Sequence, residues 1–273
     1  MSWVYVNGEL LDKSAARVSA FDHGFLYGDG VWEHLRVFDG KPLCPDAQLG
    51  HLFAAATALE IDIPLSLAEL RAAVGATVTA NDRTSGYVRV IVSRGPGTIG
   101  PDPRKIEPQV LITAEEYQPF PSELYPHGLH VVTHMAIDRD NPYHAVRVLG
   151  APHVVGAKRA ALRAGCLDAI LLDRQGRIGG TTEGRLFVVK GGVVRRAWGL
   201  PDVAADVDAT DTEVTAADVR AADEVFLAGT AAGVIAVVRC DGVDIGGGAG
   251  GPVTKEIREA YRRAVRGSGG VPV

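Results

Sequence analysis

The stretch Phe21–Arg36, FDHGFLYGDGVWEHLR, is the most informative part of this chain. It contains three closely spaced glycines, which are Gly24, Gly28 and Gly30. Such spacing predicts a backbone that needs positive φ or the close approach of another group. The following run, Val31–Val37, alternates apolar and polar residues like a half-buried strand. A glycine loop feeding a strand with Glu33 and Arg36 predicts either the wall of a site or a structural turn with a surface ion pair.

Bulk composition limits the class of protein. The chain has 273 residues, of which 47% are hydrophobic and 22% charged, as in a soluble globular protein of one large or two ordinary domains. Its net charge of −5, without any block of Lys and Arg, argues against a nucleic-acid partner. No apolar run is long enough to span a bilayer, and the N-terminus does not resemble a signal peptide. We therefore expect a cytoplasmic protein without a membrane partner.

The cysteines give no sign of a metal or disulfide framework. Cys44, Cys166 and Cys240 are odd in number and far apart in the sequence. They are expected to be ordinary buried thiols, and no metal site is predicted.

Strand and helix patterns alternate irregularly along the chain. Strands are predicted at 31–38, 87–92, 109–114, 129–133, 169–173, 186–189, 223–228 and 234–238, and helices at 46–59, 66–76, 154–164 and 254–265. Ser66 and Thr254 are the expected helix caps, and Asn7-Gly8 the expected hairpin turn. Without a regular βαβ rhythm, this favours two α+β domains. A proline-rich segment predicts a linker at 119–127, between domains at 1–118 and 128–273.

Four segments carry a family resemblance. They are Asp22–Arg36, Ser93–Gly95 (SRG), Ala157–Ile170 (AKRAALRAGCLDAI) and Ala222–Val238 (ADEVFLAGTAAGVIAVV). Together they resemble the class IV, fold type IV, pyridoxal-phosphate enzymes, which include branched-chain aminotransferases, D-amino acid aminotransferases and aminodeoxychorismate lyase. The resemblance spans nearly the whole chain. It implies a two-domain α+β fold, a cofactor cleft between the domains, and a homodimer in which each active site borrows residues from the partner subunit.

The family's Schiff-base lysine has no counterpart at its expected position. In the family it lies a fixed distance before an AKxEAxxxG helix, and the corresponding stretch here is VRVLGAPHVVGAK. Counting back from Gly165 places Arg147 at the lysine position. Arginine stays protonated and is a poor amine nucleophile, so it cannot form this link. Lys158, on the following helix, is either a displaced Schiff-base lysine or a surface charge.

Other cofactor contacts of the family also differ. His51 replaces the phosphate-binding arginine, while Gly180 and Arg185 replace the glutamate and asparagine of the VTEGTTSNIF motif. The phosphate-cupping LPGITR segment is reduced to GLPDVAADVDATD at 199–211, with the helix after it deleted. The second phosphate turn survives as Gly229-Thr230-Ala231. These losses predict that no cofactor is used and that pyridoxal phosphate is not covalently bound.

The altered pocket predicts an anionic small-molecule ligand. Arginine suits bidentate contacts to carboxylate or phosphate, and histidine titrates near neutral pH. The expected catalytic residues are Arg147, His51, His144, His153 and Glu33. The expected substrate-binding residues are Arg36, Trp32, Arg94, Arg185, Gly229, Thr230 and Ala231. We expect His/Arg acid–base chemistry of a lyase, isomerase or condensation type on a carboxylate metabolite in a biosynthetic pathway.

Two alternatives stay open from the sequence. If the alignment register is shifted, the chain is an active pyridoxal-phosphate aminotransferase or aminodeoxychorismate lyase. If the pocket has lost its chemistry, the chain is a non-catalytic relative that binds a metabolite or a partner protein. Each candidate histidine also has a plain interpretation as a capping or surface group.

Overall fold

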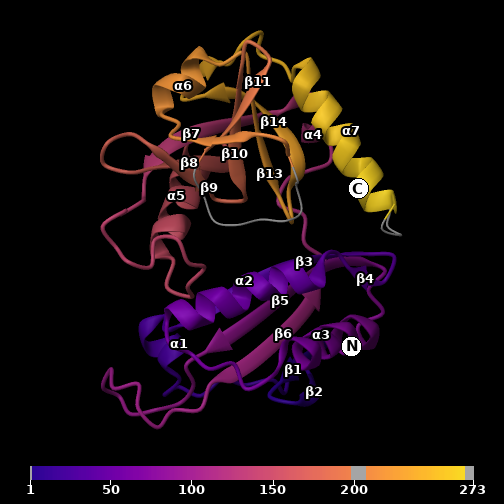
Figure 1. Ribbon diagram of the computed structural model, residues 1–273, viewed down its shortest axis with the longest axis vertical. Helices are drawn as coiled ribbons and strands as arrows, with labels where there is room; N and C mark the ends of the chain where they lie inside the picture. Colours follow the sequence, from indigo (N-terminus) through magenta and orange to yellow (C-terminus); the bar gives the residue numbers. More distant parts are fainter. Residues whose placement is uncertain (1, 198–206, 268–273) are drawn as a thin grey trace. The chain divides into compact units, whose positions relative to one another are not determined.

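The computed structural model describes residues 2–197 and 207–267, which form two compact units. The first unit is built from residues 2–117 and Val146–Ala151, and the second from Gln118–Ala145 and Pro152–Gly267. Both units mix helices and strands, which confirms the α+β class (Figure 1). The domain boundaries given above, with a linker at 119–127, stay a prediction.

A six-stranded antiparallel sheet forms the first unit, in the order β2-β1-β6-β5-β3-β4. Its strands are β1 (Trp3–Val6), β2 (Glu9–Asp12), β3 (Gly30–Phe38), β4 (Lys41–Pro42), β5 (Ser85–Ser93) and β6 (Gln109–Glu115). Strands β3 and β5 pair along their whole length, from Gly30 opposite Ser93 to Phe38 opposite Ser85. This long pairing makes β3 a rigid support for the side chains of the glycine-rich stretch.

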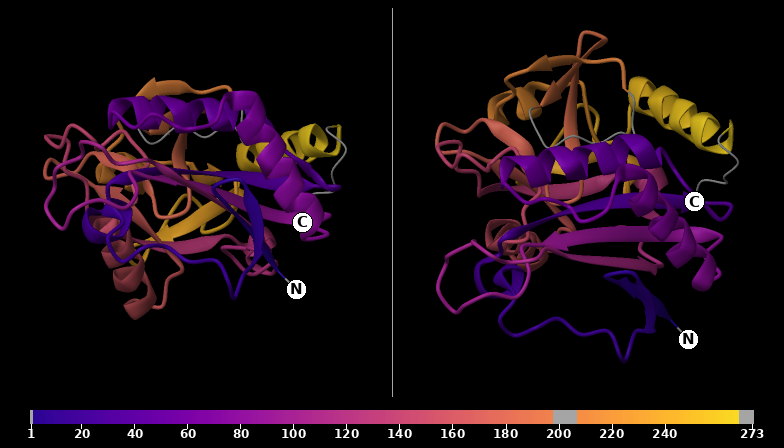
Figure 2. Two further views of the ribbon diagram at one scale, coloured as in Figure 1. Left: turned by 90° about the horizontal axis from the view of Figure 1, so that it is seen from below. Right: turned by 60° about the horizontal axis from the view of Figure 1, so that its bottom comes forward.

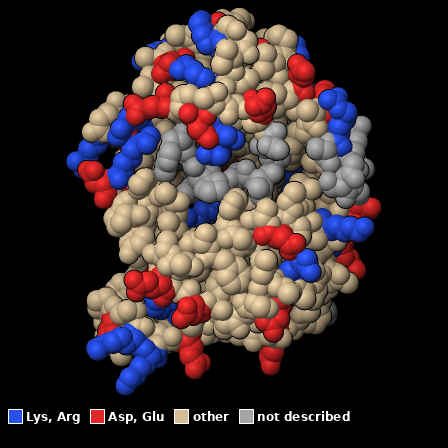
Figure 3. Space-filling model, in the orientation of Figure 1, with Lys and Arg blue, Asp and Glu red and all other residues tan. Residues whose placement is uncertain are grey.

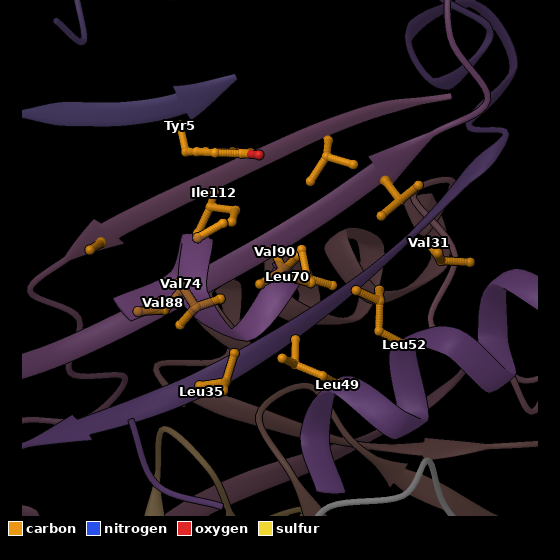
Figure 4. Packing of buried hydrophobic residues seen from close by; sticks show 14 of the residues in the cluster. Tyr5, Val31, Leu35, Leu49, Leu52, Leu70, Val74, Val88, Val90 and Ile112 are labelled. Carbon is orange, nitrogen blue, oxygen red and sulfur yellow. The ribbon is translucent and has the colours of Figure 1, made fainter. Parts of the chain in front are cut away.

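Helices α2 (Pro45–Ala58) and α3 (Leu67–Ala80) pack on one face of this sheet (Figure 2). Val31 and Leu35 of β3 are fully buried, and Leu49 of α2 lies in the same apolar core (Figure 4). Side chains alternate between the two faces of a strand, so every second residue of β3 points toward these helices. The even-numbered residues of β3 therefore lie on the opposite face.

Two local predictions for the first unit are confirmed. The amide of Ser66 donates to Glu69 Oε2 at 2.8 Å, and Ser66 Oγ accepts from the Glu69 amide at 3.3 Å. This capping box satisfies amides that the start of α3 leaves without partners. Asn7 and Gly8 have φ values of 49° and 103° and form the tight turn between β1 and β2.

A nine-stranded mixed sheet forms the second unit, in the order β12-β11-β10-β13-β14-β7-β8-β9 with β15 beside β14. Its strands are β7 (Leu129–Met135), β8 (Asp168–Leu172), β9 (Ile178–Thr181), β10 (Arg185–Lys190), β11 (Val193–Ala197), β12 (Thr210–Thr212), β13 (Glu224–Gly229), β14 (Gly233–Cys240) and β15 (Val243–Asp244). Its helices are α4 (Leu124–His127), α5 (Pro152–Arg163), α6 (Ala216–Ala221) and α7 (Pro252–Gly267). The strand order places β7 between β14 and β8, parallel to both.

The prediction that Thr254 caps the last helix is wrong, because α7 begins two residues earlier, at Pro252. Glu224 of β13 supplies the acceptor instead. Its carboxylate accepts from the amides of Val253 at 3.0 Å and Thr254 at 2.8 Å. A buried carboxylate at a helix start satisfies its amides and complements the helix dipole, so a distant strand replaces the local cap.

The predicted linker, the expected burial of the cysteines and the altered phosphate segment can each be compared with the structure. Phe120, inside the predicted linker, is fully buried in the core of the second unit. Of the cysteines expected to be buried, Cys240 is buried, whereas Cys44 is exposed and Cys166 half-buried. Residues 198–206, which hold most of the altered phosphate segment, lie outside the described residues.

Two observations bear on the partners of the chain. None of the described helices combines the length and apolarity that a membrane span requires. On the face drawn in Figure 3, basic and acidic side chains are interspersed.

Candidate active site

The segment Val146–Ala151 belongs to the first unit and pairs with the start of β3. The Trp32 amide donates to the Arg147 carbonyl at 3.1 Å, and the Leu149 amide to the Gly30 carbonyl at 2.9 Å. The indole Nε1 of Trp32 donates to the Val148 carbonyl at 3.1 Å. These three bonds fix the backbone on both sides of the Arg147 side chain.

The glycines of the opening stretch make this pairing possible. A Cβ added at Gly30 would lie 2.5 Å from Leu149 Cδ1 and 2.6 Å from the Val92 carbonyl oxygen. Gly28 has a φ of 71°, and a Cβ there would lie 2.6 Å from Gly150 Cα. Such separations are too short for a real Cβ contact, so only glycine lets the two backbones meet. The glycine-rich loop therefore packs directly against the segment that carries Arg147 and fixes its position.

The neighbouring acidic residues of this loop serve the fold. Asp22 caps α1 (His23–Tyr27) by accepting from the Gly24 amide at 2.7 Å, and it also accepts from Ser93 Oγ at 2.8 Å. Asp29 accepts from Arg94 Nε at 2.6 Å and from its Nη2 at 3.2 Å. Both aspartates thus tie the loop to the end of β5.

Glu33 is the centre of a charged cluster. Its carboxylate is 3.4 Å from Arg147 Nε and 4.0 Å from Nδ1 of His51 on α2. Glu33 is 1% exposed, and the Arg147 side chain is 12% exposed. A carboxylate this deeply buried needs a paired cation, because the desolvation of an unpaired charge costs several kcal/mol, on the order given by mutational studies.

Aromatic rings and a second arginine extend the cluster. The guanidinium carbon of Arg89, on β5, lies 4.0 Å from the centroid of the Trp32 ring, and that of Arg147 lies 5.3 Å from it. The ring of His34 lies 5.3 Å from Trp32 and 5.0 Å from Tyr87. No carboxylate of the described residues is within ion-pair distance of Arg89. Positive charge is therefore in excess at this end of β3.

The excess charge acts on His34. Burial, followed by the charges of Arg147 and Arg89, lowers the pKa of its imidazole well below the usual value of 6.5. Its Nδ1 is buried and has no hydrogen-bond partner in the described part of the chain. The histidine is therefore neutral at physiological pH.

Two other residues predicted to bind substrate have structural contacts. Arg94, besides its pair with Asp29, donates to the carbonyls of Leu59 at 2.7 Å and Glu60 at 2.9 Å, at the end of α2. Arg36 is buried, donates to the Tyr117 carbonyl at 3.5 Å, and lies 5.1 Å from the centroid of the Phe38 ring. The bonds of Arg94 account for its guanidinium without a ligand.

The remaining predicted site residues belong to the second unit. His144 Nδ1 lies 2.7 Å from the Asn141 carbonyl, and burial lowers the pKa of His153 at the start of α5. Arg185 begins β10 and pairs with Ala228 of β13. The turn Gly229-Thr230-Ala231 joins β13 to β14, and Thr230 is buried. The Glu33 cluster of the first unit is built without them.

Sequence reasoning missed Arg89, His34 and Tyr87. The signal was present in the alternation of β3 and β5, because each strand presents every second residue on one face. His34 is directly opposite Arg89 in the sheet, and Arg36 is opposite Tyr87. The register between the two strands, which the sequence does not specify, is what brings these side chains together.

Comparisons with known proteins identify the relatives of the chain. A model of the family described as Amino-transferase class IV matches residues 30–240. A putative branched-chain-amino-acid aminotransferase of Methanocaldococcus jannaschii is 34% identical over 278 residues, covering 95% of each chain. A D-alanine aminotransferase of Bacillus licheniformis is 29% identical over 282 residues, covering 96% of each.

Solved structures share the fold. The branched-chain amino acid aminotransferase of Escherichia coli matches with a TM-score of 0.89 at 26% identity, over 95% of this chain and 93% of that one. A second branched-chain amino acid aminotransferase, solved with pyridoxamine 5'-phosphate, matches with a TM-score of 0.90 at 26% identity, over 97% and 94%. The predicted fold type IV architecture is confirmed.

The expectation that no cofactor is used is wrong. It is overturned by the similarity to aminotransferases whose structures were solved with pyridoxamine 5'-phosphate or N-(5'-phosphopyridoxyl)-L-glutamate. The same findings favour the aminotransferase alternative over an enzyme that works without pyridoxal phosphate. The error came from treating altered cofactor contacts as the loss of the cofactor itself.

The side chains of the Glu33 cluster fit this cofactor in part. Arg147 and Arg89 suit a phosphate or carboxylate group, since guanidinium groups bind such anions in a bidentate manner. Neither can supply an amine for a covalent bond. Lys158 of the second unit donates to the Leu167 carbonyl at 2.6 Å and to Glu183 Oε1 at 2.9 Å. The described residues thus fit an anionic cofactor held by ion pairs, and they do not fit its covalent attachment at position 147.

The ligand types that bind metals are dispersed through the fold. Within 2–197 and 207–267, no group of three or more His, Cys, Asp or Glu side chains is placed to hold a metal ion.

Proposed function

Because the chain belongs to the class IV aminotransferase family, we propose that it is a pyridoxal-phosphate enzyme that transfers amino groups between small carboxylate-bearing metabolites. The observation that carries this proposal is the cluster that Glu33 and Trp32, on the strand after the glycine-rich loop, form with Arg147 of the segment 146–151. The similar proteins also favour an enzyme, since their names are putative branched-chain-amino-acid aminotransferase and D-alanine aminotransferase.

The proposed substrate is an anionic amino acid or keto acid. Arg89 is exposed and lacks an ion-pair partner within the described residues, so its guanidinium is open to a substrate carboxylate. The indole of Trp32 supplies an apolar surface beside it and holds the cation by a cation–π contact. Together these two side chains favour a substrate with a carboxylate next to a hydrocarbon group.

Glu33 and its neighbours have a positioning part in the proposed reaction. Pyridoxal phosphate, when bound, supplies the electron sink for chemistry at the substrate carbon next to the amine. Glu33, buried and shared between Arg147 and His51, holds the guanidinium of Arg147 in one orientation. The preorganised positive charge of Arg147 then stabilises negative charge on whichever anionic group lies beside it. We propose that this pairing replaces the covalent anchor.

A homodimer is part of the proposal. Around α1 the first unit exposes apolar side chains that include Phe25, 74% exposed, and Ile99, 75% exposed. Tyr27 joins the two parts of this surface, since its hydroxyl donates to the Ile99 carbonyl. Exposed apolar groups of this size favour a protein partner, and the family resemblance makes a second copy of the chain the expected one. A cytoplasmic location is kept as a prediction.

The test is reconstitution of the purified protein with pyridoxal phosphate. We expect a change in its absorption spectrum, and amino transfer from D- or L-amino acids to keto acids that depends on the added cofactor. Dialysis should remove the cofactor, and borohydride treatment should leave the protein mass unchanged. A spectrum that does not respond to pyridoxal phosphate contradicts the proposed function.

The Arg147→Lys variant gives the test its control. Its amine should let borohydride fix the cofactor to the chain at position 147, which peptide mass mapping would locate. Fixation to Lys158 in the unmodified protein would instead mean that the covalent anchor has moved, and the ion-pair anchor proposed above would be wrong.

A further inference from the structure

His34 is the least explained polar side chain of the Glu33 cluster. It is 7% exposed, lies between the rings of Trp32 and Tyr87, and has no hydrogen bond at Nδ1 to any described residue. A buried polar atom without a partner costs about 1–3 kcal/mol. Buried polar groups in native proteins are nearly always bonded, so an exception calls for an explanation.

The surroundings of His34 are cationic and aromatic. The charged and titratable side chains that act on its ring are Tyr87 and Arg89 of β5 and Arg147 of the segment 146–151. Beyond them, Tyr117 contacts Tyr87, and Arg36 is the next residue of β3 on the same face. Glu33 accepts from the backbone amide of His34 at 2.9 Å, but its carboxylate already faces Arg147. The ring of His34 therefore meets two guanidinium charges and no acceptor of its own among the described residues.

We infer that His34 is a substrate-binding residue, which takes up a proton and donates it in a hydrogen bond when a carboxylate binds beside Arg89 and Arg147. This inference rests on the proposed function, because it concerns the same carboxylate-bearing substrates. The anion neutralises the guanidinium charges that, after burial, lower the proton affinity of the imidazole, and a protonated imidazole is a donor at both nitrogens. In the free protein, burial together with this repulsion keeps the ring unprotonated.

Linkage fixes the direction of the pH effect. If the bound anion raises the proton affinity of His34, protonated His34 must by the same amount raise the affinity for the anion. Carboxylate affinity should therefore increase as the pH falls from 7 toward 5, by at most about tenfold per pH unit for one linked proton. A neutral analogue, such as the corresponding primary amide, gains nothing from protonation. His34 thus gives the site a preference for acids over amides that grows at lower pH.

The experiment is calorimetric titration of the purified protein with an aliphatic carboxylate, butyrate, in two buffers of different ionisation enthalpy between pH 5 and 7.5. We expect uptake of a fraction of one proton per butyrate bound, and none with butyramide. His34→Asn should still bind butyrate, without proton uptake and with affinity nearly independent of pH in this range. His130→Asn is the matched control, because His130 is an exposed histidine of β7 in the second unit and has no part in the Glu33 cluster, so its loss should leave the uptake in place.

Folding of the variants is checked by thermal unfolding, with His34→Gln as a second substitution. The histidine ring signals in NMR spectra give an independent readout, since the signal that disappears in His34→Asn should titrate at higher pH when butyrate is present. Butyrate binding without proton uptake in the unmodified protein would overturn the role of His34. That result would leave amino transfer intact, whereas proton uptake in a protein without amino transfer would overturn the proposed function instead.

Discussion

Each unit of this protein pairs a carboxylate that is shielded from solvent, fully or in part, with a cation, but the two units differ in the groups that surround the cation. In the second unit, Lys158 donates to the Leu167 carbonyl at 2.6 Å and to Glu183 at 2.9 Å. In the first unit, Arg147 Nε is 3.4 Å from Glu33 Oε1, and its guanidinium carbon is 5.3 Å from the centroid of the Trp32 ring. Lys158 donates to a carbonyl and a carboxylate of the protein, whereas Arg147 lies beside a carboxylate and an aromatic ring that Arg89 also contacts.

The surroundings shift the pKa of one titratable group in each cluster, and the two shifts have opposite directions. Burial and nearby guanidinium charges lower the pKa of His34, while burial and the charge of Glu183 raise the pKa of Asp168 to about 6. Thr182 limits that rise, because its amide and hydroxyl donate to Asp168 Oδ1 at 3.0 and 2.5 Å. A buried polar group that accepts hydrogen bonds from the protein itself, such as Asp168 Oδ1, serves to stabilise the fold. A surplus of one charge among rings indicates a place for a ligand of the other charge.

The strongest test of this contrast replaces the two cations in turn. Arg147→Ala should lower kcat/KM for amino transfer by about 100-fold or more per folded molecule, because it removes the charge proposed to hold an anionic group. Its unfolding free energy should fall by about 2–3 kcal/mol, since Glu33 then stays buried without its nearest cation. Steady-state kinetics and urea unfolding measure the two effects.

Lys158→Ala is the matched control, because its loss should affect stability alone. It should lower the unfolding free energy by about 1–2 kcal/mol, through the loss of a partly exposed ion pair and a hydrogen bond. Its activity per folded molecule should stay within about threefold of the unmodified protein. Loss of activity in Lys158→Ala with normal activity in Arg147→Ala would mean that Lys158, and not Arg147, acts in the reaction.

Asp168 allows a test by pH. Its folded-state pKa of about 6 lies above the ordinary value of 3.8, so the folded protein binds the extra proton and stability is lost as the pH rises from about 4 through 6. The expected loss from this group is roughly 2–3 kcal/mol. Asp168→Asn cannot ionise, and its stability should fall less over the same range. Urea unfolding at pH 4, 5, 6 and 7 compares the two proteins, and parallel curves would mean that Asp168 is not the responsible group.

The smallest expected effect concerns the ring beneath the arginines. Trp32→Phe keeps an aromatic face but loses the larger indole and its hydrogen bond to the Val148 carbonyl. We expect KM for a carboxylate substrate to rise about threefold to fivefold, in line with about 0.5–1 kcal/mol for a cation–π contact at a partly exposed site. An unchanged KM would show that Arg89 and Arg147 do not depend on this ring.

Much of the fold could be predicted from local pattern. The alternation of β3, the helical spacing of α2 and the box at Ser66 are all short-range signals, and each appears in the structure as predicted. Thr254 shows the limit of such signals, because the acceptor for the start of α7 is Glu224, which lies 30 residues earlier. A cap borrowed from a distant strand leaves no local trace.

The candidate site was less predictable. Glu33, Arg147, His51 and Trp32 are all candidates from the sequence, and the structure brings them together. Arg94 is expected to bind substrate, but its guanidinium already donates to the carboxylate of Asp29 and to two backbone carbonyls at the end of α2. His34 was not recognised, since its neighbours depend on the register of β3 against β5. Cofactor use was misjudged because it follows from the relatives rather than from any one side chain.

The return of Val146–Ala151 to the first unit has a consequence for how the chain folds. Trp32 and Val148 are bonded across 116 positions of sequence, so this part of the first unit cannot be completed while only residues 2–117 have left the ribosome. Contacts of such long sequence separation slow folding, and the unfinished edge of β3 stays open to wrong partners meanwhile. At about 5–20 residues per second, synthesis of the connecting stretch adds a delay on the order of seconds. Codons that slow or speed the synthesis of residues Gln118 to Ala151 should therefore change the yield of correctly folded protein.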